Sequence, residues 1–298
     1  FLLFDYKGEF SDIQNNHWLS LFDVDRSCIL DPLTQPLPFT PFKDFTGRSI
    51  NEINLYSTEM SSALCSIDRV SASANMNNRL SEAIVEAYKS TNGAPISFEL
   101  MLKCYQSRMK DANNDDSISS VLKQLVNAHI FESEDKVSLI DDSYIIKMDG
   151  YPKDGPIAKA IVYFLMSKLN NIYELLDKQA VNDEVVQIRH FSIIDEAHYM
   201  LDFDNRPLRN LIAVGRNKGL SIILATQNMS SFKSKGFDFY ANAQYPLIMK
   251  QQTIDDKVIK DLFGVSGQEL QEIRTAIAGL QKGELIIKDQ MAFALGMG

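Results

Sequence analysis

The stretch FSIIDEAH, residues 191–198, decides the fold of this chain. Its first four residues are mostly apolar and predict a short buried strand. Asp195 and Glu196 follow directly, so in a parallel sheet both carboxylates would lie at the carboxyl edge, where α/β proteins bind ligands. One acid can then hold a hydrated Mg²⁺ while the other polarises an attacking water. The simpler alternative is that the two acids cap the next helix.

The sequence around this stretch alternates between strand and helix patterns. Pro156 opens a long helix with apolar residues at helical spacing, and a run of Ile and Leu follows Gly219. We expect strands at 144–148, 185–194, 220–225, 245–249 and 284–288, and helices at 156–176, 206–217, 254–263 and 266–278. This alternation predicts an α/β fold with a mostly parallel sheet covered on both faces.

The N-terminal half contains a first strand, a loop and a helical region. Residues 1–5 predict a buried strand, and the prolines of residues 28–42 predict a loop. We interpret residues 51–140 as a mainly helical insertion into a core formed by residues 1–50 and 141–298. Within the insertion, residues 118–141 also allow a helix followed by a small hairpin, as in a winged helix.

A second stretch with chemical potential is GRNKGLSIILATQ, residues 215–227. Gln227, at a strand end beside the acidic pair, can hydrogen-bond to a γ-phosphate and to the attacking water. An arginine here can serve as an arginine finger that stabilises charge on a neighbouring subunit's γ-phosphate. Arg206, Arg209 and Arg216 are the candidates, and we favour Arg216 or Arg209. The alternative for each arginine is a basic residue favoured by a helix dipole.

Three segments in this order resemble the HerA/FtsK superfamily of ring-forming P-loop DNA translocases. They are DYKGEF (5–10) after an apolar strand, DEAH (195–198), and GRNKG (215–219) leading to a strand that ends in ATQ. DEAH alone is not specific, but the ordered combination is. The resemblance covers residues 1–50 and 141–298. Within the superfamily, the chain looks most like the ATPase part of a DNA phosphorothioation-dependent restriction protein.

The resemblance implies a RecA-like P-loop core that uses ATP and Mg²⁺. Asp195 would bind Mg²⁺ through water as the Walker B acid, Glu196 would be the general base, and Glu9 would support the nucleotide site. The implied partners are DNA, further copies of the protein in a ring that we expect to be a hexamer, and other restriction-system subunits.

One family motif is absent, because no GxxxxGK[ST] phosphate loop occurs in the chain. In the family, a strand, this loop and a helix precede the DxxGE segment, and that strand lies beside the ATQ strand. We therefore expect the parent protein to supply this first βα unit, and the chain as given to be inactive alone. Two alternatives stay open: a catalytically silent structural fragment, and a fragment of a DEAH-type superfamily-two helicase.

Composition limits the class of protein further. The 298 residues carry a net charge of −9, which excludes a uniformly basic protein that coats nucleic acid. DNA would therefore bind to a local basic strip or a pore loop. The three cysteines have no CxxC spacing, which argues against a zinc site and favours a reducing, cytoplasmic location. The sequence has no run of 18 apolar residues, so we expect no membrane-spanning helix.

Overall fold

A computed structural model of the chain describes residues 1–12, 14, 28–67, 72–110, 114–182, 185–227, 229–234, 237–243 and 245–287. The chain divides into two compact units, residues 1–225 and 226–298.

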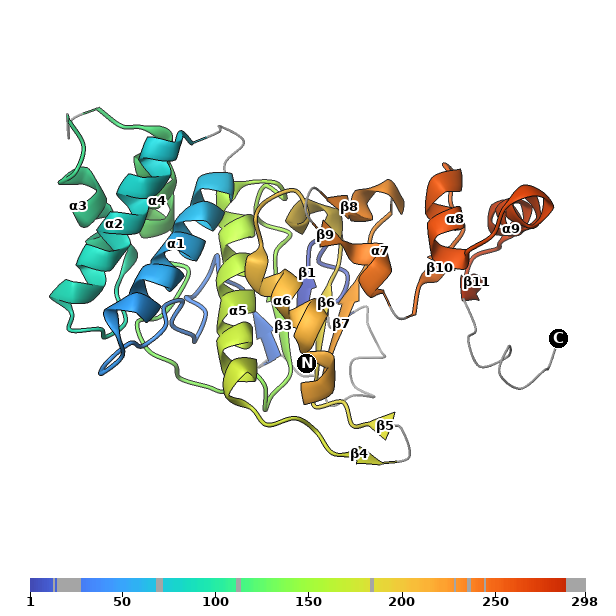
Figure 1. The fold of residues 1–298 in the computed structure, drawn as a ribbon, viewed down its shortest axis with the longest axis horizontal. Helices are drawn as coiled ribbons and strands as arrows, with labels where there is room; N and C mark the ends of the chain where they lie inside the picture. Colours follow the sequence, from blue (N-terminus) through green and yellow to red (C-terminus); the bar gives the residue numbers. More distant parts are fainter. Residues whose placement is uncertain are drawn as a thin grey trace. The chain divides into compact units, whose positions relative to one another are not determined.

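The first unit is mixed α/β (Figure 1). Its strands are β1 (Leu2–Asp5), β2 (Ile29–Leu30), β3 (Tyr144–Lys147), β4 (Val181–Asn182), β5 (Val185–Val186), β6 (His190–Ile194) and β7 (Leu220–Leu224). Its helices are α1 (Ile50–Ile67), α2 (Ala74–Ser90), α3 (Phe98–Gln106), α4 (Ser117–Ala128), α5 (Pro156–Leu175) and α6 (Arg206–Val214), with 3₁₀ turns η3 (Ala197–Met200) and η4 (Arg216–Lys218).

Five strands of this unit form a parallel sheet in the order β2-β3-β1-β6-β7. The first strand, β1, therefore lies in the middle, with Leu3 paired in register with Ile145 on one side and Ile193 on the other. The crossovers through α5 and α6 run in the same direction along the sheet. Because such crossovers are right-handed, both helices lie on one face (Figure 1).

The opposite face of the sheet is apolar as well. Leu3 and Ile145 are buried there, and Ile193 packs beside them. Toward β7, however, Phe191 is 39% exposed and Ile223 is 42% exposed. The crossover helices α5 and α6 lie on the other face, so among the described residues of the first unit no connecting helix covers this end. β7 is the last strand in the sheet order.

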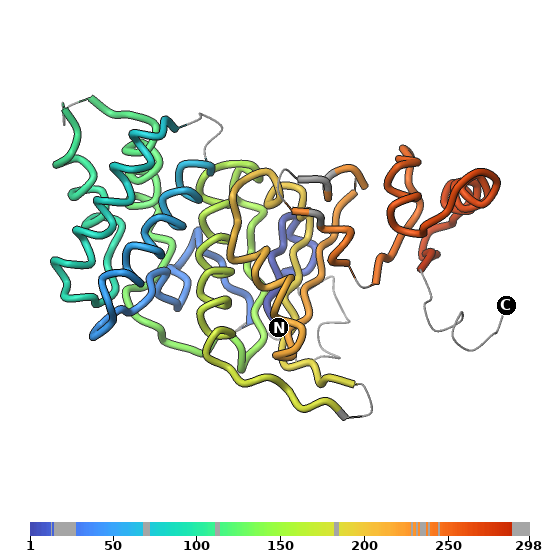
Figure 2. The backbone as a smooth tube through the Cα atoms, viewed as in Figure 1, coloured from blue at the N-terminus to red at the C-terminus, as the bar shows by residue number. Residues whose placement is uncertain are grey.

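The helical region between β2 and β3 consists of α1 to α4, which follow one another along the tube in Figure 2. Side chains of Ser73, Ser97 and Asp116 cap α2, α3 and α4, as their short polar side chains favour. The winged-helix alternative for residues 118–141 is wrong. Residues 129–143 form no strand, and Phe131 makes only an isolated bridge to Leu37.

The second unit contains short elements around its own small core. They are η5 (Met229–Phe232), β8 (Lys233–Ser234), β9 (Phe237–Asp238), α7 (Phe239–Asn242), β10 (Leu247–Met249), α8 (Asp256–Phe263), α9 (Gly267–Gly279) and β11 (Leu285–Ile287). The predicted strands at 245–249 and 284–288 are present as β10 and β11, but they pair antiparallel with each other, outside the parallel sheet. The core gathers around Val258, Ile259 and Ile277.

Candidate functional site

The carboxyl edge of the parallel sheet brings together the ends of β1 and β6. β1 ends at Asp5, and β6 ends at Ile194, directly before Asp195 and Glu196. Phe4 is paired in register with Ile194, and the Asp195 nitrogen donates to the Phe4 carbonyl at 3.3 Å. The acidic pair therefore lies at the edge that the sequence indicates, and Asp5 adds a third carboxylate there.

The Asp5 carboxylate organises the loop that follows β1. Asp5 is buried, and its Oδ1 accepts backbone N–H bonds from Lys7 at 3.3 Å and Gly8 at 2.9 Å. Its Oδ2 accepts from Phe10 at 3.0 Å and Ser11 at 2.8 Å. Because hydrogen bonds to a charged acceptor are stronger than neutral ones, this carboxylate fixes the path of the loop.

Glu196 is buried between two basic side chains. The Lys7 Nζ lies 2.5 Å from Oε1, and the His198 Nδ1 lies 3.3 Å from Oε2. The hydrogen bond to Glu196 raises the pKa of Lys7 above its ordinary value. Glu196 also has left-handed backbone angles, φ 48° and ψ 42°, which cost a non-glycine residue about 1–2 kcal/mol. Such conformations persist where the surroundings enforce them.

Asp195 is only partly buried beside this ion pair. Burial raises the pKa of the Asp195 carboxyl, the charges of Glu196 and Asp5 raise it further, and the ammonium of Lys7 opposes the shift. The two adjacent acids thus have different surroundings: Glu196 is buried against Lys7 and His198, and Asp195 is only partly buried.

Tyr6 and Lys159 are two buried groups beside the segment that follows the acidic pair, and sequence reasoning missed both. Lys159, on α5, is 1% exposed, and its Nζ lies 3.2 Å from Asp202, just beyond the DEAH turn. Tyr6 stacks on Tyr199 with ring centroids 5.9 Å apart, and burial raises its pKa well above the ordinary value. The sequence carries no signal for Lys159, because this residue lies opposite the apolar stripe of the predicted helix, where a lysine is ordinarily exposed.

The two candidate arginines lie at different edges of the sheet. Arg209, in α6, has its Nη2 2.9 Å from Oδ1 of Asp204, in the segment after the DEAH turn. Arg216 is exposed in η4, shortly before β7 begins at Leu220, so it lies at the amino edge. Within one chain, the structure does not bring Arg216 to the acidic pair.

Gln227 and Glu9 are the remaining candidates. Gln227 belongs to the second unit, so it is not among the residues that the first unit brings together. Glu9 is exposed in the Asp5 loop, whereas Lys7 of the same loop reaches Glu196.

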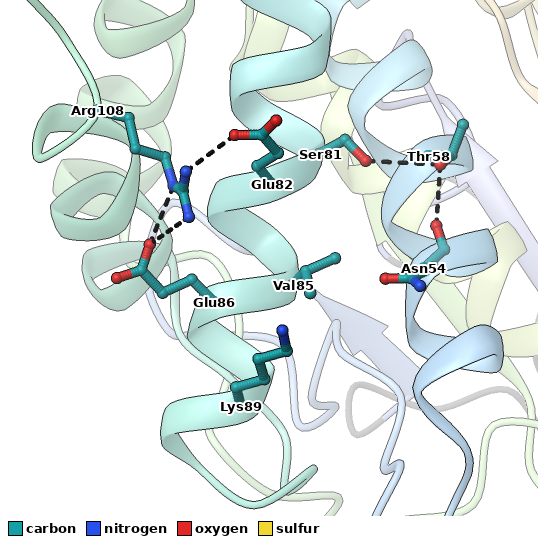
Figure 3. Close-up of a pocket in the computed structure, with 8 residues that line it drawn as sticks. All are labelled: Asn54, Thr58, Ser81, Glu82, Val85, Glu86, Lys89 and Arg108. Atoms are coloured by element: carbon teal, nitrogen blue, oxygen red, sulfur yellow. Dashed lines mark hydrogen bonds and ion pairs between the residues drawn. The ribbon is translucent and has the colours of Figure 1, made fainter.

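A cavity of about 470 Å³ lies in the helical region, between α1 and α2 (Figure 3). Its lining consists of Asn54, Thr58, Ser81, Glu82, Val85, Glu86, Lys89 and Arg108. Arg108 is paired with Glu82 at 2.9 Å and with Glu86 at 2.8 Å, both on α2. The lining contains none of the candidate residues, so we assign the site to the sheet edge and not to this cavity.

The carboxylates at the sheet edge are the side chains that could hold a metal ion. Across the described ranges, no three His, Cys, Asp or Glu side chains are grouped so as to hold a metal by themselves. Mg²⁺ in nucleotide sites needs only one or two carboxylates, because waters and phosphate oxygens complete its shell. The acidic pair fits that requirement.

Among the residues that the structure describes, no helix has both the length and the apolarity to cross a bilayer.

No family model matches the sequence, and no curated protein matches it. Among solved structures, the chain is similar to VirB4 of Thermoanaerobacter pseudethanolicus, with a TM-score of 0.63 and 15% identity, over 96% of this chain and 80% of that one. It is also similar to the bacterial conjugative coupling protein TrwBdeltaN70 in a form with sulphate, with a TM-score of 0.56 and 13% identity, over 96% and 74%. A third similar structure is that of the plasmid coupling protein TrwB with the ATP analogue ADPNP. Its TM-score is 0.51 and its identity 13%, over 96% of this chain and 81% of that one. These similarities confirm the predicted fold class, an α/β core with a mostly parallel sheet that is RecA-like in layout.

Proposed function

We propose that this chain carries the Walker B half of the nucleotide site of an ATP-driven DNA translocase. The observation that supports it is the pair Asp195-Glu196 at the carboxyl edge of a parallel sheet, on a fold shared with a protein whose structure holds an ATP analogue. In this proposal ATP is the substrate, and DNA and further copies of the protein are its partners. The DxxGE, DEAH and ATQ motifs in combination favour a translocase that works in a DNA restriction system, together with other subunits of that system.

The acidic pair divides the chemistry of ATP hydrolysis. Glu196 takes the proton of the attacking water, and Asp195 holds Mg²⁺ through a water. When bound, Mg²⁺ supplies positive charge that neutralises the phosphate oxygens. Gln227 contacts the γ-phosphate and the attacking water, and Glu9 supports the site. Arg216, or in its place Arg209, reaches a neighbouring subunit's nucleotide.

The partly exposed apolar end of the sheet supports the proposal that another βα unit of the parent protein carries the phosphate loop. β7 is the last strand in the sheet order, and Phe191 and Ile223 on the face beside it are partly exposed. An edge strand with apolar neighbours favours pairing with a further strand. A unit docked there would stand next to the strand that leads to Gln227. Without it, the chain lacks the backbone N–H groups and lysine that grip β- and γ-phosphates, so residues 1–298 alone should be inactive.

The test is ATP hydrolysis by the full-length protein with and without duplex DNA. Glu196→Gln keeps the size of the side chain but removes the base, so it should hydrolyse ATP about 10²–10⁴-fold more slowly. DNA should raise the wild-type rate, because a translocase couples turnover to its track. Glu99→Gln, at the exposed start of α3, is the matched control and should leave the rate unchanged.

Two results would contradict the proposal. If Glu196→Gln turns over ATP like the wild type, the acidic pair is not catalytic. If DNA never changes the rate, the protein is not a motor, and the silent structural role takes its place. A second RecA-like domain in the parent would favour the superfamily-two helicase.

A further inference from the structure

The carboxylate of Glu196 is fully engaged in this structure. Its side chain is only 5% exposed, with Lys7 against Oε1 and His198 against Oε2. A general base must present an oxygen to the proton that it abstracts, within hydrogen-bond distance. Enclosed in this way, Glu196 has little access to an attacking water.

Lys7 is held in place by the loop from which it extends. Its own backbone N–H and those of three other loop residues bond to the buried Asp5 carboxylate. Gly8 allows the next turn with φ 73°, a conformation that favours glycine. The ammonium is therefore presented to Glu196 by a fixed support, although 29% of the Lys7 side chain is exposed.

The two partners of Glu196 differ in strength. The contact of Lys7 is shorter than that of His198, 2.5 Å against 3.3 Å, and the lysine always carries its charge near neutral pH. Removing one partner of a buried ion pair leaves the other charge uncompensated, so Glu196 is held mainly by Lys7.

We propose that Lys7 restrains the general base: the resting protein keeps Glu196 engaged, and hydrolysis proceeds only when the Lys7 ammonium leaves Oε1. The inference rests on the proposed function, since it assigns a regulator to the same site. Lys7 is a positioning residue that acts through Glu196, and it lies in the very loop that carries Glu9. A displacement of the Asp5 loop would release the base, so this loop is where a partner's signal would reach the chemistry.

The first experiment compares ATPase kinetics of the full-length wild type with Lys7→Met, Lys7→Arg and Glu196→Gln. Methionine keeps the length of the side chain without its charge. Lys7→Met should raise the DNA-free kcat about tenfold, equivalent to about 1.4 kcal/mol in activation free energy. KM for ATP should stay within about twofold, because Lys7 acts on the base and not on nucleotide binding. Stimulation by DNA should fall correspondingly, and Lys7→Arg should behave as the wild type.

The matched control is Lys147→Met. Lys147 ends β3 at the same sheet edge and is paired with Asp31 at 3.6 Å and Asp149 at 3.9 Å, but it does not contact Glu196. The Lys147→Met variant should leave kcat and the stimulation by DNA unchanged. A rise in both lysine variants would overturn the proposal, since a general loss of positive charge would then explain it.

A second experiment needs no ATPase activity. Lys7→Met and Glu196→Gln are combined in a double-mutant cycle of chemical unfolding of the full-length protein. The double variant should cost less stability than the sum of the single variants, because the pair is coupled. Additive costs would overturn the contact itself.

The outcomes separate the two proposals. A wild type that hydrolyses ATP, an inactive Glu196→Gln and an unchanged or slower Lys7→Met would overturn the restraint alone. A wild type without ATP hydrolysis would overturn the proposed function together with the restraint, whatever the double-mutant cycle gives.

Discussion

A side chain at Gly8 would collide with Asp149. A Cβ built on Gly8 lies 2.7 Å from Oδ2 of Asp149, and Gly8 has φ 73°. Gly47 has the same φ of 73°, but nothing lies within 4 Å of the Cβ position. The two glycines therefore separate the cost of the backbone conformation from the cost of crowding.

Gly8→Ala should destabilise the protein more than Gly47→Ala. We expect Gly47→Ala to cost about 1–2 kcal/mol, the penalty of a left-handed conformation for an L-residue. Gly8→Ala should cost more, because Asp149 must also move. Urea unfolding of both variants measures the difference. Equal costs would mean that the Asp149 side chain moves aside freely.

Asp5→Asn should destabilise the protein by about 2–3 kcal/mol, because an amide offers one oxygen where four backbone N–H groups need acceptors. Asp44→Asn is the control. Asp44 accepts one backbone bond from Thr46 at 2.8 Å at an exposed position, so its loss should cost less than about 1 kcal/mol. Chemical unfolding compares the two, and a smaller effect at Asp5 than at Asp44 would show that the loop does not depend on the carboxylate.

His190 should make stability depend on pH. It is 2% exposed at the start of β6, and burial lowers its pKa to about 4 from an ordinary value of 6.5. The unfolded chain therefore binds a proton between about pH 6.5 and 4 that the folded chain does not. This contribution to stability is complete above about pH 6.5 and declines as the pH falls toward 4, by about 3 kcal/mol in total.

The measurement is unfolding free energy against pH for the wild type, His190→Leu and His129→Asn. His190→Leu should flatten the slope between pH 6.5 and 4. His129→Asn, at an exposed left-handed position that Asn tolerates, should leave it unchanged. An unchanged slope in His190→Leu would assign the pH dependence to the carboxylates.

Asp195→Asn and Glu196→Gln should give different phenotypes in the full-length protein. Asp195→Asn removes a charge facing the metal, so it should weaken Mg²⁺-dependent nucleotide binding. Glu196→Gln should bind MgATP and DNA like the wild type and fail only in turnover. Titration with a fluorescent nucleotide, with Mg²⁺ and with EDTA, measures binding. Identical binding defects in both variants would reject the division of roles.

Arg216→Ala should abolish hydrolysis in the full-length protein while nucleotide binding stays nearly intact, because an arginine finger acts on a neighbour's transition state. Arg206→Ala is the control, since Arg206 pairs with Glu59 of α1 within the chain at 2.9 Å. The ATPase rates of the two variants test this role, and light scattering measures the oligomeric state of the protein. A wild type that is fully active as a monomer would exclude a role for Arg216 in a neighbouring site.

Much of the first unit could be predicted because each element carries its own pattern. The apolar stripe of α5, the run of Ile in β7 and the acids after β6 are all local features. The predicted strand at 185–194 is instead divided, because the backbone nitrogens of Arg189 and His190 both donate to the Gly219 carbonyl at the point where β6 begins.

The contacts of the site could not be predicted in the same way. The pairing of Lys7 with Glu196 depends on the middle position of β1 in the sheet and on a positive φ at Glu196. Neither is encoded in a short window of sequence. The antiparallel pair β10 and β11 was missed for a related reason, because a short apolar run does not reveal its pairing partner.

The middle position of β1 also matters while the protein is being made. Leu2–Asp5 leaves the ribosome well before its partners β3 and β6, which begin only at Tyr144 and His190. At about 5–20 residues per second, the roughly 140 residues before β3 take on the order of ten seconds to synthesise. Helices α1 to α4 rest on contacts close in sequence and can fold on the nascent chain during that time. The apolar strand β1 remains unpaired until β3 and β6 have been synthesised, so a chaperone can bind it during that interval.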